Sequence, residues 1–191
     1  MALRITVTRV LPSGAIFAAL LAAALLADLA LHRAGLAWVG RWGGLAGASL
    51  ILSSFLYSAR KRKLLAAGSP KGLLRAHEAL GWAGALLVLV HGGIHFNALV
   101  PWLALFVMVV VVASGLTGRF LLEDARESLR ERADEMKRAG LAPAEVEREL
   151  LSASLLVDAM KQWRKVHLPL TMVFAGLAIV HVVTTLLFWR W

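Results

Sequence analysis

The chain contains no cysteine. This absence excludes disulfide bonds, thiolate-ligated iron–sulfur clusters and thioether attachment of a porphyrin. Charged residues are also scarce, at 17%, whereas hydrophobic residues reach 59% and the mean hydropathy is +0.71. Since this composition is too apolar for an ordinary soluble domain, we expect an integral membrane protein.

The net charge of +9 comes from short clusters of Lys and Arg that lie beside apolar runs. The strongest cluster, within residues 60–75, is typical of a loop on the cytoplasmic side of a membrane. The same charge could suggest nucleic-acid binding, but its placement next to apolar segments favours a topological role. We therefore expect contact with membrane lipid and no nucleic-acid partner.

Five apolar segments of sufficient length occur, at residues 15–31, 36–57, 76–99, 102–122 and 166–191. The first could be a signal peptide, but we expect a retained helix. The second carries Gly43 and Gly47 at a four-residue step, which favours close helix packing. With the basic loop inside, the N-terminus is cytoplasmic and the C-terminus lies outside an inner (cytoplasmic) membrane.

Residues 123–165 have a different character, with mixed charges at helical spacing and a break between Gly140 and Pro143. This pattern predicts a cytoplasmic hairpin of two amphipathic helices. It is either a solvated connector or a docking platform for a redox subunit. The expected fold is thus an all-α helical bundle, with one membrane domain formed by residues 1–122 and 166–191.

A histidine repeat organises the chain. HEALGWAGALLVLVH spans residues 77–91, and HLPLTMVFAGLAIVH spans residues 167–181. Fourteen residues bring the second imidazole of a helix to within about 40° of the first and about 21 Å along the axis. Because the two helices run in the same direction in the five-span topology, His77 pairs with His167 near the cytoplasm, and His91 pairs with His181 toward the outside.

Two histidines at each level match the two axial positions of a haem iron, to which the porphyrin supplies four nitrogens. Structural zinc requires four close ligands, and histidines about 21 Å apart on one helix cannot share an ion. Packing histidines remain the alternative, but four at matching spacing favour a function. We expect two haem b groups that transfer electrons, and no catalytic residue on this chain.

These paired histidines resemble the di-haem four-helix core of the cytochrome b and b6 group, which cytochrome b561 and ferric-reductase-like membrane domains share in outline. The resemblance covers residues 77–91 and 167–181 and implies bis-histidine ligation, with electron transfer across the bilayer to or from quinone. The chain departs from it in being short, in carrying the hairpin, and in lacking a Pro-Glu-Trp-Tyr motif. Since nothing resembles a flavin or nicotinamide fold, a self-contained ferric reductase is not expected.

Several further residues are candidates for the cofactor sites. Gly81 and Gly84 could give the porphyrin edges room or could serve helix packing. Basic residues that could pair with the propionates of the inner haem, or simply set the topology, are Arg75, Arg119, Arg164 and Lys165. Protonatable groups that could form a quinone site, or merely lie at the interface, are His95, Asp28 and His32.

Together these patterns predict a membrane-anchor subunit of a respiratory-type oxidoreductase. Electrons would pass between a quinone (menaquinone or ubiquinone) and a cytoplasmic iron–sulfur or flavin partner. Two alternatives stay open: a cytochrome without a quinone site, and a haem-free scaffold or proton-conducting subunit in which the histidines serve protons or packing.

Overall fold

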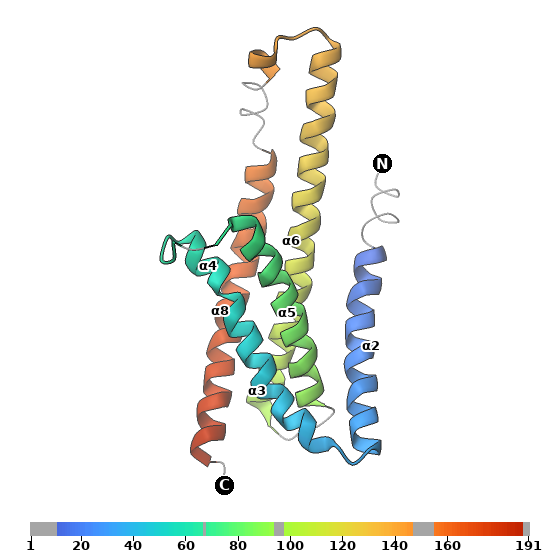
Figure 1. Ribbon diagram of the computed structural model, residues 1–191, viewed down its shortest axis with the longest axis vertical. Coiled ribbons are helices and arrows are strands. Elements are labelled where there is room, and N and C mark those ends of the chain that lie inside the picture. The colour runs from blue at the N-terminus through green and yellow to red at the C-terminus, as the bar shows by residue number, and fades with distance from the viewer. Residues whose placement is uncertain (1–10, 67, 94–97, 147–154, 189–191) are drawn as a thin grey trace.

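The computed structural model describes residues 11–66, 68–93, 98–146 and 155–188 (Figure 1). Its elements are all helices: α2 (Leu11–Arg33), α3 (Ala37–Ser54), α4 (Leu56–Lys61), α5 (Pro70–Gly92), α6 (Leu99–Arg138) and α8 (Leu155–Phe188). No strand occurs in the described ranges. The predicted all-α class is therefore confirmed.

Within the described ranges, four helical segments are long and apolar enough to cross a membrane. They are Gly14–Arg33 in α2, Pro70–Gly92 as α5, Leu99–Arg119 in α6 and Lys161–Phe188 in α8. Large apolar side chains on the helix surfaces are open to the surroundings, with Leu187 72% and Phe188 80% exposed. Apolar surfaces of this kind suit contact with lipid rather than water, so the structure supports a membrane protein.

The remaining predicted segment, residues 36–57, forms α3 followed by the short α4. It is not among the four segments that are apolar enough to cross a membrane. Arg41 and several glycines lower its hydropathy. These glycines pack against α5, as the sequence predicts for Gly43 and Gly47. A Cβ on Gly47 would lie 2.8 Å from the carbonyl oxygen of Gly84, so the two backbones are almost in contact.

The helices associate as two close pairs, with α3 against α5 and α6 against α8, while α2 packs on α5 (Figure 1). By contrast, the backbones of α5 and α8 stay apart along nearly their whole length. Both helices nevertheless run downward in Figure 1, so they are co-directional, as predicted. The side chains of α5 and α8 must therefore reach across a space in order to meet.

The helices on both sides of the predicted hairpin are continuous with the apolar segments. α6 continues without interruption past residue 122 to Arg138, and α8 is already helical from Leu155. Both helices therefore project beyond their apolar segments (Figure 1), and a turn with Gly140 at φ +83° follows α6. Charged side chains at three- and four-residue spacing sustain a helix in water, so the change in hydropathy does not end α6.

Candidate functional site

The four histidines of the repeat meet as two couples between α5 and α8. The ring centroids of His91 and His181 lie 6.5 Å apart, with the ring planes inclined by 48°. The imidazoles of His77 and His167 lie close enough to interact electrostatically. The structure thus brings each histidine of α5 near the histidine of α8 with which the sequence pairs it.

The separation of the His91 and His181 rings matches a shared metal centre. With metal–nitrogen bonds of about 2 Å, two imidazoles bound to opposite sides of one iron have their ring centroids about 6 Å apart. A direct hydrogen bond between the imidazoles would bring the centroids closer than the 6.5 Å found here, whereas packed ring pairs span about 4.5 to 7 Å. The ring separation therefore fits the distance expected for one iron held by the two imidazoles.

Backbone carbonyls of α3 orient both histidines of α5. The Nδ1–H of His77 donates to the carbonyl of Ser54 at 3.0 Å, and that of His91 donates to the carbonyl of Gly40 at 3.2 Å. Gly40 and Ser54 are fourteen residues apart, as are His77 and His91. Since Nδ1 is used in this way, Nε2 is the nitrogen left for a metal.

His167 is held by contacts with α6 and with Trp163 of its own helix. Its Nδ1 lies 3.2 Å from the hydroxyl of Ser114, and its ring stacks on Trp163 with centroids 4.5 Å apart. The indole N–H of Trp163 donates to the carbonyl of Ser114 at 2.8 Å. Gly118 makes room for the indole, since a Cβ there would lie 2.5 Å from the indole nitrogen. These contacts fix the ring plane of His167.

Gly44 is a site residue that sequence reasoning missed. A Cβ at this position would lie 2.5 Å from Cγ of His91, so only glycine leaves the imidazole its place. The signal available in the sequence was the adjacent pair Gly43-Gly44, of which only the first was assigned to packing. Ser54, Ser114 and Trp163 were likewise missed as partners of the histidines, and Tyr57 lies 5.7 Å from the ring of His77.

The two glycines proposed to clear a porphyrin edge have different surroundings. Gly84 is buried against α3, where a Cβ would lie 2.7 Å from a side-chain carbon of Ile51. This position shows the helix-packing role directly. A Cβ on Gly81 would meet nothing within 4 Å, so a clearance role at Gly81 stays a prediction.

The basic candidates for propionate binding are also separated by the fold. Positions two residues apart on a helix are about 200° apart around its axis. Lys165 therefore lies on the side of α8 away from His167, and Arg75 lies on the side of α5 away from His77. Arg164 is within about 60° of His167, and Arg119 approaches Glu78 at 3.9 Å across α5 and α6.

The proposed quinone residues Asp28 and His32 lie together against the end of α5. The Nδ1 of His32 is 2.9 Å from the Asp28 carbonyl and 3.2 Å from the Asp28 carboxylate. A Cβ on Gly93, which has φ +50°, would lie 3.3 Å from that carboxylate. The pair thus lies beside the segment that carries His91. The third candidate, His95, falls outside the described residues.

Within the described ranges no three His, Cys, Asp or Glu side chains converge on one point. The geometry of this site is that of histidine couples, which suits a metal that brings its other ligands with it. No family model, curated protein or solved structure matches the chain.

Proposed function

We propose that this protein is a membrane cytochrome that holds two haem b groups between α5 and α8. His77 and His167 would ligate the inner iron, and His91 and His181 the outer one. The observation that carries the proposal is the 6.5 Å separation of the His91 and His181 rings across two backbones that do not pack on each other.

The second support is the preorganisation of the imidazoles. Carbonyl acceptors at Gly40 and Ser54 fix the ring orientation and tautomer before any metal binds. In metal sites this second contact also raises the basicity of the ligand nitrogen. When bound, haem would supply one-electron chemistry, while the chain orients the ligands and fills both axial positions, so that each iron transfers electrons rather than binding oxygen.

The two levels, about 21 Å apart along the helices, would form a conduit across the bilayer. In this proposal α3 completes a fifth crossing, although its composition is less apolar, because it lies alongside α5 (Figure 1). The basic cluster within residues 60–75 supports a cytoplasmic position for the inner couple. The N-terminus is then cytoplasmic and the C-terminus lies outside.

The proposed electron partners are a quinone at the outer level and a cytoplasmic iron–sulfur or flavin subunit. The Asp28–His32 pair supports the first, since it places protonatable groups beside the end of α5. The projecting ends of α6 and α8 support the second by offering a surface outside the apolar segments. The chain would be the electron-transfer subunit of an oxidoreductase complex.

Spectroscopy of the purified chain tests the haem proposal. We expect a b-type reduced-minus-oxidised spectrum and two haems per chain in a pyridine haemochrome assay. His91→Ala and His181→Ala should each lose the same single haem, and His77→Ala and His167→Ala the other. His32→Ala, a histidine outside the couples, is the matched control and should keep both.

The absence of any b-type band in the wild-type chain would refute the haem proposal. Loss of different haems in His91→Ala and His181→Ala would refute the pairing. Quinone analogues should slow haem reduction by quinol if the outer site exists, and unchanged reduction would favour a cytochrome without a quinone site.

A further inference from the structure

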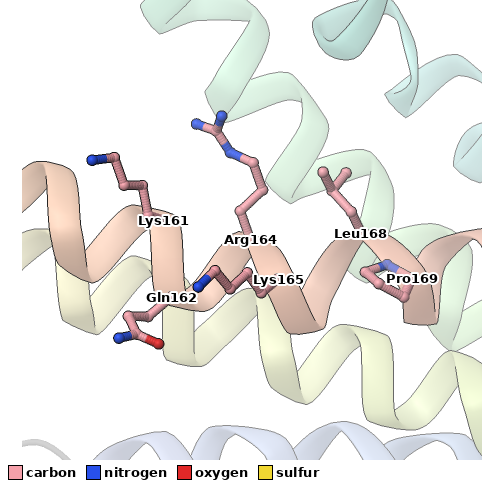
Figure 2. A pocket seen from close by; sticks show the side chains of 6 residues that line it. All are labelled: Lys161, Gln162, Arg164, Lys165, Leu168 and Pro169. Atoms are coloured by element: carbon pink, nitrogen blue, oxygen red, sulfur yellow. The ribbon is translucent and has the colours of Figure 1, made fainter.

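A cavity of about 690 Å³ opens on α8 near the point where its apolar segment begins. Its lining residues are Lys161, Gln162, Arg164, Lys165, Leu168 and Pro169 (Figure 2). Volumes of about 300 to 1,000 Å³ are typical of small-molecule sites. The cavity is therefore large enough for a ligand headgroup rather than a single ion.

The cavity lies mostly on the side of α8 away from His167, with Arg164 at its nearer edge. Lys161, Lys165 and Leu168 recur at steps of four and three residues, which places them on one side of α8. His167 is about 200° from Lys165 around the helix axis. A phosphate held by Lys161 and Lys165 is therefore on a different side of α8 from His167, and its binding does not require haem.

The lining is strongly cationic. Three of the six residues carry a positive charge and none is a carboxylate. Lys61 of α4 is a fourth cation in this region. Its pKa is lowered by burial and by the charge of Arg164, which lines the cavity. In Figure 2 the side chains of Lys161 and Arg164 extend on the same side of α8. Like charges held this close are stabilised by a bound anion.

An exposed apolar stripe continues from the cavity along the membrane segment. Leu168 lies at its start, and Met172, Ile179 and Leu186 follow at steps of four and seven residues on the same face of α8. Met172 is 57% exposed, Ile179 62% and Leu186 59%. The cationic cavity and the apolar stripe together form an amphipathic surface with its charge at one end.

We propose that this surface binds an anionic phospholipid, with the phosphate of its headgroup in the cavity and an acyl chain along the stripe. Basic pockets where membrane helices leave the bilayer are suited to acidic lipid headgroups. A lipid whose phosphate occupies the cavity can contact the cations and the stripe at once, whereas a soluble anion can contact only the cations. Continuity of the two surfaces is therefore what favours a lipid.

Native mass spectrometry of the full chain in detergent tests this inference. The probes are dioleoylphosphatidylglycerol and, as the zwitterionic comparison, dioleoylphosphatidylcholine. We expect retained phosphatidylglycerol, and an apparent affinity at least about tenfold lower in the triple variant Lys161→Gln, Arg164→Gln and Lys165→Gln. The control variant Arg130→Gln, Arg132→Gln and Lys137→Gln removes the same charge from α6 and should bind like the wild type.

Three results would overturn the inference. They are equal binding of the two lipids, unchanged phosphatidylglycerol binding in the triple variant, and displacement of the lipid by millimolar inorganic phosphate, which would indicate a soluble-anion site. Lys165→Gln alone gives a second measurement if the triple variant unfolds, and it should show a weaker but measurable loss. Haem content does not enter any of these outcomes, so failure here leaves the electron-transfer proposal standing.

Discussion

Replacement of Gly44 by alanine is a sharp test of the outer histidine couple, because it alters the site without touching a proposed ligand. The new Cβ would lie 2.5 Å from Cγ of His91 and 2.6 Å from Nδ1. Carbon atoms in contact prefer about 3.5 to 4.0 Å. The imidazole would therefore have to move by about 1 Å, or α3 would have to withdraw from α5 by as much.

A displacement of this size is large compared with what metal ligation allows. Coordination distances in protein sites vary by about 0.2 Å, and the His91 ring is also tied to the carbonyl of Gly40 at 3.2 Å. Overpacking of this kind also destabilises a fold by about 1 to 3 kcal/mol. We expect the haem content of the Gly44→Ala variant to fall from two haems per chain to one.

Gly43→Ala is the matched control, since a Cβ there would lie 3.5 Å from the carbonyl oxygen of Leu87, an ordinary contact. It should keep both haems in the pyridine haemochrome assay. The single haem left in Gly44→Ala should have the same redox midpoint as the one left in His91→Ala. Two haems with an unshifted spectrum in Gly44→Ala would show that His91 is not held where the structure places it.

Further variants probe the inner couple and the bundle around it. Ser114→Ala should keep both haems but raise the midpoint potential of one, because loss of the Nδ1 partner makes His167 a weaker donor, and a redox titration measures this. Gly118→Ala should lower the free energy of unfolding by about 1 to 3 kcal/mol through a clash with the indole beneath it, whereas Gly176→Ala, with nothing within 4 Å, should not. Stability should rise with pH toward 10.5, since the lowered pKa of Lys61 means that the unfolded chain binds more protons in that window, and Lys61→Gln should remove this rise in thermal unfolding scans.

The histidine couples could be predicted from the sequence because they depend on a single periodicity. Fourteen residues is close to a whole number of helical turns, so the repeat alone places His77 and His91 on one face of α5. The direction of α5 relative to α8 then follows from the count of helices between them. Neither step requires knowledge of which side chains surround the imidazoles.

The surroundings of the imidazoles could not be predicted, because they depend on the register between helices. Nothing in the sequence aligns Gly40 with His91 or Ser54 with His77, since antiparallel packing of α3 on α5 sets both contacts at once. The end of α6 could not be predicted for a related reason. Hydropathy reports where lipid contact ends, whereas α6 ends only at Arg138.

The low hydropathy of α3 and its role beside the histidines have a common cause. Gly44 and Gly47, which weaken its apolar character, are the residues whose missing side chains leave room for His91 and for the backbone of α5. Larger apolar residues would make α3 a clearer membrane span but would push it away from α5. The carbonyls of Gly40 and Ser54 would then lose contact with the imidazoles. The glycines that let α3 pack closely on α5 therefore also make it less apolar than the neighbouring helices.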